Sequence, residues 1–183
     1  MSIANGKLPR VSQALRVLED SYAGVPQYAL DVAAERGTAL HRLCLTYLAS
    51  LDGVHDAPVP TPPYEAPYQA FVKWVTDHGV LSVAIEQASQ NDKHGYCGTP
   101  DAMVIYRGAY TIIDLKFTAS VLRINRVQIQ AYRRLDDYKE ATQAIILHID
   151  PRTGHLKQET VKSNLRDWSA FLNALSVLKW RTQ

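Results

Sequence analysis

The hydrophobic pattern is most regular between Gly98 and Phe117, where two apolar segments flank a short turn. Val104–Tyr106 and Tyr110–Ile113 are rich in the β-branched and aromatic side chains that favour strands. Arg107-Gly108 lies between these segments and favours a tight turn. The pattern therefore predicts a β-hairpin over this stretch of the chain.

The register of this hairpin decides which charged side chains meet. If the turn is symmetric, Asp101 lies directly opposite Asp114, and such neighbours have Cβ atoms about 4.5–5.5 Å apart. Asp114 and Lys116 share the same face, because side chains alternate along a strand. Two facing carboxylates repel, and a bound divalent cation held by oxygen ligands is the simplest remedy. An asymmetric turn would offset the two aspartates diagonally.

Helical periodicity predicts three helices before the hairpin. Apolar residues recur there every three or four positions, as they do on one face of an amphipathic helix. The predicted helices cover Ser12–Tyr22, Gln27–Leu51 and Tyr68–His78.

The second half of the long predicted helix carries a histidine on its apolar face. Gly37 favours a kink or boundary, and Thr38 can cap the segment that follows. His41 then shares a face with Cys44, Leu45 and Leu48 at helical spacing. We therefore expect the His41 side chain to point inward rather than to solvent.

Loops and one strand separate the helices from the hairpin. The proline-rich segment 57–67 predicts a surface loop, which can serve as a linker or as a flap that faces a substrate. Leu81–Ala88 predicts a strand with Glu86 near its end. Ser89–Gly95 predicts a polar loop.

The remaining elements complete a mixed sheet. We expect a helix over Ile124–Tyr138, strands over Gln143–Asp150 and His155–Val161, and a final helix capped by Asn164. The resulting order αβββαβ predicts an α/β protein, with an α+β mixed sheet and helices on both faces.

Length and composition predict one domain without a membrane segment. The chain has 183 residues and 46% hydrophobic content, which suits a single domain over residues 1–183. We place its core at about 35–162, with an N-terminal helical region and a C-terminal helix as additions. Apolar runs are too short for a membrane span, and a signal peptide is not expected. Cys44 and Cys97 form no zinc or disulfide pattern, which indicates a reducing compartment.

The net charge of only +2 means that any nucleic-acid contact must come from a local patch. Such a patch could be formed by basic residues of the predicted polar loop and of the helix that follows the hairpin: Lys93, His94, Arg123, Arg126, Arg133 and Arg134. A solvated helix face explains each of these positions equally well.

Five sequence elements, taken in order, resemble those of one nuclease family. Pro100-Asp101 and Asp114-x-Lys116 resemble the signature of the PD-(D/E)xK nuclease superfamily, and the subtype is similar to RecB-type and phage-type stand-alone exonucleases. The segment around His41 is similar to the upstream G-x-x-x-H helix of that group. Gly98-x-Pro-Asp resembles its G-x-x-D segment, and Gln128 to Tyr132 resembles its Q-x-x-x-Y helix.

The resemblance implies a restriction-endonuclease-like αβββαβ core and metal-dependent phosphodiester hydrolysis. Asp101, Asp114 and the Leu115 carbonyl would bind one or two Mg²⁺ or Mn²⁺ ions. His41 would be a further metal ligand, and Glu86 could reach the ions through water. An iron–sulfur cluster is not expected, because iron–sulfur members of the group carry four cysteines and this chain has two.

The resemblance also assigns catalytic and supporting roles. Lys116 would orient or deprotonate the attacking water, while Gln128 and Tyr132 would support the site or touch phosphate. Ordinary structural readings remain open: a histidine packed in the core, an exposed strand carboxylate at Glu86, and helix packing for Gln128 and Tyr132.

The leading hypothesis is a metal-dependent DNA exonuclease of recombination, repair or phage DNA processing. Its expected partners are single- or double-stranded DNA ends, and a recombination or single-strand-binding protein, in the cytoplasm of a bacterium or phage-infected host. A structure- or site-specific endonuclease is the second hypothesis. The third is a nuclease-like domain that only binds nucleic acid or a partner, which predicts a broken metal site.

Overall fold

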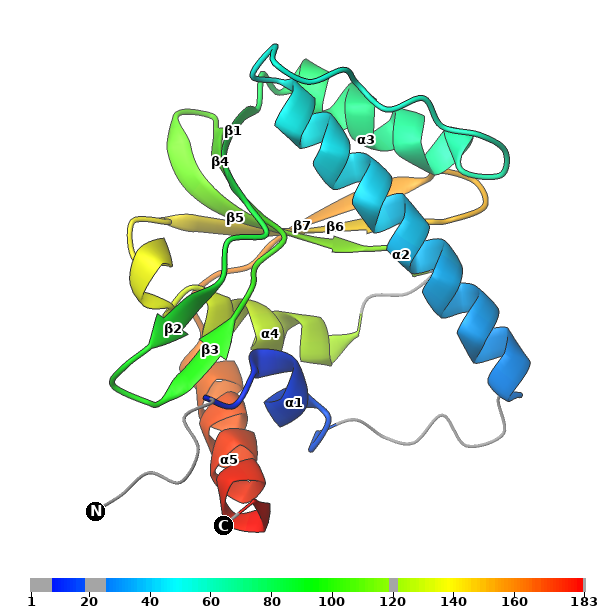
Figure 1. Ribbon diagram of the computed structural model, residues 1–183. Helices are drawn as coiled ribbons and strands as arrows, with labels where there is room; N and C mark the ends of the chain where they lie inside the picture. Colours follow the sequence, from blue (N-terminus) through cyan, green and yellow to red (C-terminus); the bar gives the residue numbers. More distant parts are fainter. Residues whose placement is uncertain (1–7, 19–25, 119–121, 183) are drawn as a thin grey trace.

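The computed structural model describes residues 8–18, 26–118 and 122–182. Within them, a mixed five-stranded sheet lies between two layers of helices (Figure 1), with the strand order β1-β4-β5-β6-β7. These strands span Leu81–Ile85 (β1), Ala102–Tyr106 (β4), Ala109–Lys116 (β5), Gln143–Ile149 (β6) and Leu156–Thr160 (β7). The predicted α/β class, with a mixed sheet and helices on both faces, is confirmed.

Two helices cover one face of the sheet and three cover the other (Figure 1). The first layer consists of α2 (Gln27–Ser50) and α3 (Glu65–Asp77). The second consists of α1 (Val11–Leu15), α4 (Arg123–Tyr132) and α5 (Leu165–Arg181). No helix in the described segments combines the length and hydropathy needed to span a bilayer.

The β4–β5 hairpin has the predicted symmetric register. Tyr106 pairs with Ala109 and Ala102 with Ile113, so the next pair outward is Asp101 with Asp114. Arg107 and Gly108 both have positive φ values, 51° and 77°, as a two-residue type I′ turn requires. The diagonal arrangement of the two aspartates is therefore excluded.

The alternation of side chains along β5 separates two apolar clusters. Ile113 and Leu115 pack in the cluster beneath α2 and α3, whereas Ile112 packs with α1, α4 and α5. Asp114 and Lys116 consequently share the face of Ile112, the one that α4 covers. The parallel pairing of β5 with β6 follows from the crossover through α4.

The long helix is not interrupted where the sequence predicted a boundary. α2 runs continuously through Gly37, and the Thr38 hydroxyl donates to Ala34 O at 2.9 Å inside the helix. The predicted kink and internal cap are therefore wrong. One glycine in a helix costs only about 1 kcal/mol relative to alanine, which is too little to end a helix by itself.

Three other helix boundaries differ from the prediction. The predicted helix over Ile124–Tyr138 is α4, which ends at Tyr132, followed by a short 3₁₀ turn η1 (Asp136–Tyr138). α3 begins at Glu65 rather than Tyr68. α1 ends at Leu15, and the predicted continuation beyond residue 18 lies outside the described residues.

The predicted polar loop over Ser89–Gly95 is wrong in its first part, because Ser89–Asn91 forms a strand of a small second sheet, whereas residues 92–95 form a turn as expected. β2 (Ser89–Asn91) pairs antiparallel with β3 (Tyr96–Gly98). β1 ends at Ile85 because Glu86 has φ 45°, in the left-handed region that interrupts a strand. The predicted strand over Leu81–Ala88 was therefore three residues too long.

The predicted cap of the last helix is confirmed. Asn164 Oδ1 accepts hydrogen bonds from the backbone N–H groups of Arg166, at 2.9 Å, and Asp167, at 3.4 Å. These contacts satisfy two of the four donors that a helix leaves unpaired at its start.

We expect Asn164→Ala to lower the free energy of unfolding by about 1 kcal/mol, because it removes this cap. The matched control is Asn173→Ala on an exposed turn of the same helix, where alanine should be neutral or slightly stabilising. Urea unfolding of both variants measures the difference. Equal stability losses in the two variants would contradict the capping role.

Candidate active site

Five of the predicted site residues converge at one end of the sheet. His41 comes from the middle of α2, and Glu86 directly follows β1. Asp101 directly precedes β4, whereas Asp114 and Lys116 are among the last three residues of β5. Four separate chain segments thus place polar groups around one position.

Asp101 joins α2 to the hairpin. Its Oδ2 atom lies 2.9 Å from His41 Nε2 and accepts a hydrogen bond of 2.6 Å from the Leu115 backbone N–H. Burial alone would lower the pKa of His41, but the hydrogen bond and charge of Asp101, with the charge of Glu86, outweigh it and raise the pKa. The predicted inward orientation of His41 is confirmed, with 27% of its side chain exposed.

Asp114 is a fully buried carboxylate with a single ionic contact. Its Oδ2 atom lies 2.7 Å from Lys116 Nζ, outside hydrogen-bond alignment, and Oδ1 has no hydrogen-bond partner within the described chain. Burial raises the pKa of Asp114 to about 6, against the lowering effect of Lys116. A buried charge is costly unless it is paired and hydrogen-bonded, so half of this carboxylate is available to another ligand.

Lys116 is held as a cation by the same pair of aspartates. Burial by itself would lower the pKa of the ammonium group, but the charges of Asp114 and Asp101 outweigh burial and raise the pKa. One-fifth of its side chain, 21%, remains exposed. Lys116 therefore presents a positive charge at the edge of the site.

Glu86 approaches the site from its outer side. Its backbone N–H donates to Asp101 O at 3.0 Å, which fixes the left-handed residue against the start of β4. The Oε1 atom lies 4.0 Å from His41 Nδ1, and 61% of the side chain is exposed. A non-glycine residue in this conformation is strained, and such strain is concentrated at functional sites.

Gln128 and Tyr132 contact each other on the buried side of α4. Gln128 Nε2 donates to the Tyr132 hydroxyl at 2.8 Å. Burial raises the pKa of Tyr132, and the charges of Asp114 and Asp101 raise it further. Neither residue forms a hydrogen bond with Lys116 among the described contacts, so their predicted orienting role stays a prediction.

Gly98 permits a close approach between β3 and α4. A Cβ atom at this position would lie 3.0 Å from a ring carbon of Tyr132 and 3.0 Å from a methyl group of Val11 in α1. The glycine of the predicted G-x-x-D segment thus serves packing behind the site.

His148 is a polar neighbour of the site that sequence analysis left without a partner. It pairs with Lys116 across the parallel β5–β6 ladder and is 4% exposed. Neither ring nitrogen has a hydrogen-bond partner within the described chain, and burial lowers the pKa of the imidazole. A lone histidine in the apolar segment Gln143–Ile149 was the available signal, but its register with Lys116 required the sheet.

The donor set fits a hard divalent cation, although no ready ligand cage exists. Within the described residues, no three His, Cys, Asp or Glu side chains are arranged to hold one ion together. The two aspartates are instead directed towards His41 and Lys116, as described above. The buried Asp114 Oδ1 atom without a partner is the observation that fits a cation, because Mg²⁺ and Mn²⁺ prefer carboxylate oxygen.

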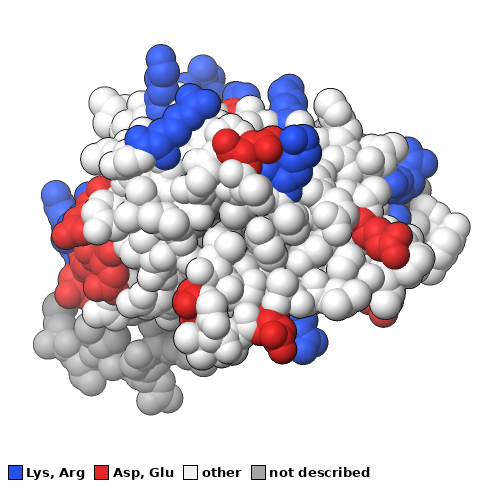
Figure 2. Space-filling model, turned by 90° about the horizontal axis from the view of Figure 1, so that it is seen from above, with Lys and Arg blue, Asp and Glu red and all other residues white. Residues whose placement is uncertain are grey.

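The predicted basic patch divides into two groups at opposite ends of α4. Arg123 and Arg126 lie near its start, in a cavity of about 450 Å³, and contact Asp167 and Glu159. Lys93, His94, Arg133 and Arg134 line a different cavity beyond its end. On the face seen from above the molecule, cationic and anionic side chains are interspersed (Figure 2).

The pH dependence of stability can reveal the raised pKa of Asp114 in the absence of metal. Its pKa of about 6 in the fold exceeds the ordinary value, so between about pH 4 and pH 6 the folded chain keeps a proton that the unfolded chain has released. Stability from this group is therefore lost as pH rises. Relative to Asp114→Asn, the wild type should lose up to about 3 kcal/mol between pH 4 and pH 7 in chelator.

The matched control for this experiment is Asp77→Asn, which removes an exposed carboxylate of α3. A stability difference between the wild type and Asp114→Asn that stays constant from pH 4 to pH 7 would contradict the raised pKa.

Comparison with solved structures identifies the fold. The chain is similar to an alkaline exonuclease, LHK-Exo from Laribacter hongkongensis, with a TM-score of 0.54, 11% identity, and coverage of 96% of this chain and 87% of that one. LHK-Exo in complex with dAMP gives a TM-score of 0.53 at 11% identity, with 95% and 87% covered. A protein named SSO0001 gives 0.51 at 14% identity, with 100% and 80% covered.

Sequence comparison gives no such match. No protein-family model and no curated protein sequence matches the chain. At identities of 11–14%, the likeness lies in the arrangement of the backbone. The chain therefore has the fold of these structures, which confirms the architecture expected from the sequence.

Proposed function

We propose that the chain is a divalent-metal-dependent DNA nuclease, and that it acts as an exonuclease. The observation that carries the proposal is the β4–β5 register, which makes Asp101 and Asp114 the next facing positions beyond the pair Ala102–Ile113, with Lys116 in contact with Asp114. This arrangement satisfies the geometry expected from the P-D…D-x-K signature. Two of the similar structures are of one alkaline exonuclease, LHK-Exo, and one of them holds dAMP, which supports DNA as the substrate.

The proposed metal ligands are Asp101, Asp114 and the Leu115 carbonyl, with His41 and Glu86 as additional groups. Asp114 is proposed as a ligand because its carboxylate is buried and its Oδ1 atom has no hydrogen-bond partner among the described residues. His41 and Asp101 already lie in contact. A bound Mg²⁺ or Mn²⁺ ion would polarise the phosphate and lower the pKa of a bound water.

Lys116 supplies the positive charge that phosphodiester hydrolysis requires of the protein. In its charged form the ammonium group can hold an attacking water by hydrogen bonds and offset the negative charge that develops on the phosphorus oxygens. A cation next to Asp114 would oppose the two aspartates that now raise the pKa of Lys116, which favours a role as a base. Gln128 and Tyr132 are proposed to support this face of the site from α4.

The chemistry can be tested with single substitutions. We expect the wild type to cleave linear DNA only with Mg²⁺ or Mn²⁺, and Mn²⁺ to be at least as effective because imidazole suits it better. Asp114→Asn and Lys116→Met should each lower the cleavage rate by about 100-fold or more, measured by release of labelled nucleotides. Activity in Mg²⁺ with inert Mn²⁺ would contradict the ligand role of His41.

The matched controls come from the exposed ion pair Lys73–Asp77 on α3, in which the charged atoms are 2.8 Å apart. Asp77→Asn and Lys73→Met make the same chemical changes away from the sheet end. If Asp114→Asn and Lys116→Met were both as active as the wild type and as the two controls, the proposed site would be refuted.

An exonuclease needs a free end, whereas an endonuclease does not. We expect the wild type to degrade a linear plasmid and to leave the covalently closed form of the same plasmid intact. Gel analysis over a time course distinguishes the two outcomes. Cleavage of the closed circle at a comparable rate would replace the exonuclease proposal with the endonuclease one.

A further inference from the structure

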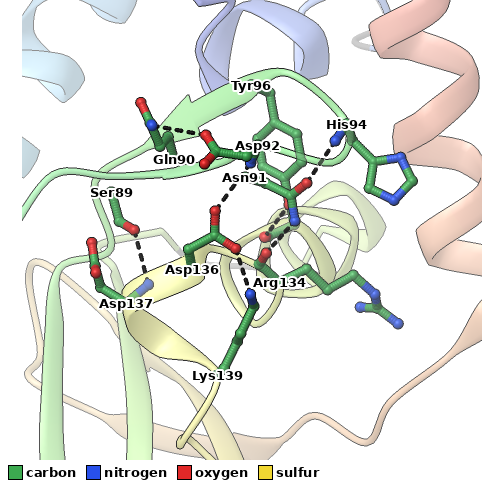
Figure 3. A network of polar contacts seen from close by, with 11 residues as sticks. Ser89, Gln90, Asn91, Asp92, His94, Tyr96, Arg134, Asp136, Asp137 and Lys139 are labelled. Atoms are coloured by element: carbon green, nitrogen blue, oxygen red, sulfur yellow. Dashed lines mark hydrogen bonds and ion pairs between the residues drawn. The ribbon is translucent and has the colours of Figure 1, made fainter.

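A cationic cavity lies away from the proposed active site, between the β2–β3 turn, the end of α4 and α5. We call it the hairpin pocket, and its volume is about 330 Å³. The residues that matter for its chemistry are Asn91, Lys93, His94, Arg133, Arg134 and Trp168. Figure 3 shows this part of the structure, with His94 and the Arg134 guanidinium on the same side of the polar network.

The positive charges of the hairpin pocket are not neutralised by the protein. Lys93, Arg133 and Arg134 make no ion pair with a carboxylate among the described residues, and only Lys139 at the rim does so, with Asp136 at 2.6 Å. Asp92, which precedes Lys93, accepts a hydrogen bond from Gln90. The pocket is therefore a place where an external anion would find unpaired cations.

The two arginines are both partly desolvated and fixed in place. Arg133 donates to the carbonyl groups of Val161 and Thr142, each at 3.1 Å, and Arg134 donates to Gln130 O at 2.8 Å. Burial lowers the pKa of both guanidinium groups, which still remain charged at neutral pH. Neutral carbonyl partners orient these cations without cancelling their charge, so an anion would offset a desolvation cost already present.

The turn that carries Lys93 and His94 is held rigidly against α4 (Figure 3). Asn91 is the central contact, because its Nδ2 donates to Arg134 O while its Oδ1 accepts from the His94 backbone N–H at 2.8 Å. Lys179 of α5 donates to His94 O at 2.7 Å. These contacts fix the backbone of the turn, so ordering of the turn costs little conformational entropy when a ligand binds.

The aromatic surface of the hairpin pocket is already used by the protein. Arg134 lies over the Trp168 ring at 4.4 Å, and Phe171 stacks against the same ring with centroids 5.6 Å apart. The His94 ring contacts it edge-on at 5.2 Å. Since Trp168 has these partners, it is not presented as a platform on which a base could stack. The chemistry of the pocket thus suits phosphate groups rather than nucleobases.

We propose that the hairpin pocket binds backbone phosphates of the DNA substrate at a distance from the scissile bond, and so holds the substrate without regard to sequence. This inference rests on the proposed nuclease function.

Binding measurements in EDTA test the pocket without cleavage. The variants are Lys93→Gln, on an exposed turn position, Arg134→Gln, and the double variant; the matched control is Lys73→Gln on α3. With a fluorescein-labelled 25-base-pair duplex, each pocket substitution should weaken binding about fivefold on any sequence and reduce the slope of log K against log salt by about 1. Lys73→Gln should leave both quantities unchanged.

The outcomes separate this inference from the proposed function. Hydrolysis of thymidine 5′-monophosphate p-nitrophenyl ester, which is too short to reach the hairpin pocket, should be equal in wild type and Lys93→Gln. A wild type that fails to cleave both this ester and linear DNA would refute the nuclease function. A wild type that cleaves DNA while both pocket variants keep its affinity and salt slope would overturn the pocket alone.

Two further results decide doubtful cases. If Arg134→Gln lowers the melting temperature by removing its contact with Trp168, the affinity and salt slope of Lys93→Gln decide whether the pocket binds DNA. If the variants lose binding of free dAMP, measured by calorimetry, while duplex affinity is unchanged, the pocket belongs to a free nucleotide and the backbone assignment is wrong.

Discussion

The structure depends on one electrostatic constraint, the close approach of two carboxylates across a β-hairpin. The type I′ turn fixes the register, and the register places Asp101 beside Asp114 although the two carboxylates repel each other. His41 and Lys116 respond to that constraint by contacting one aspartate each. The Oδ1 atom of Asp114 is buried and has no hydrogen-bond partner among the described residues. The two carboxylates favour a nearby cation, and the charged Lys116 favours a nearby anion, so the charges of the site are compatible with the metal and the phosphate of the proposed function.

The sequence carried this constraint in full because it is local. A two-residue turn between β-branched segments determines its own register, so the opposition of Asp101 and Asp114 could be counted from the turn. Helical spacing likewise placed His41 on the inward face of α2. By contrast, the position of His148 beside Lys116 depends on the pairing of β5 with β6, whose first paired residues, Thr111 and Gln143, are 32 positions apart. No local pattern specifies that pairing.

The errors in the predicted elements have the same origin. Gly37 and Thr38 resemble a boundary when they are read locally, but the hydrogen-bonded helix continues through them, although every buried residue of α2 lies after Gly37. Ser89–Gly95 resembles a polar loop because β2 and β3 are short, and their pairing is stabilised by Asn91 and Tyr96 contacts to the end of α4. The basic residues of α4 looked like one patch in sequence. The length of the helix separates them into groups with different partners, and only one group lacks carboxylates.

Gly98 links the proposed site to a part of the chain that carries none of its charges. Its missing side chain lets Tyr132 and Val11 meet behind the hairpin, and the N–H of Cys97 next to it donates to Pro9 O at 2.9 Å. The segment around α1 is therefore part of the wall that holds Tyr132 in place. Changes in residues 9–15 can alter the shape of the site from behind, even though they leave every aspartate, lysine and histidine untouched. A fusion or deletion in that segment is thus not a neutral choice for studying the catalytic chemistry.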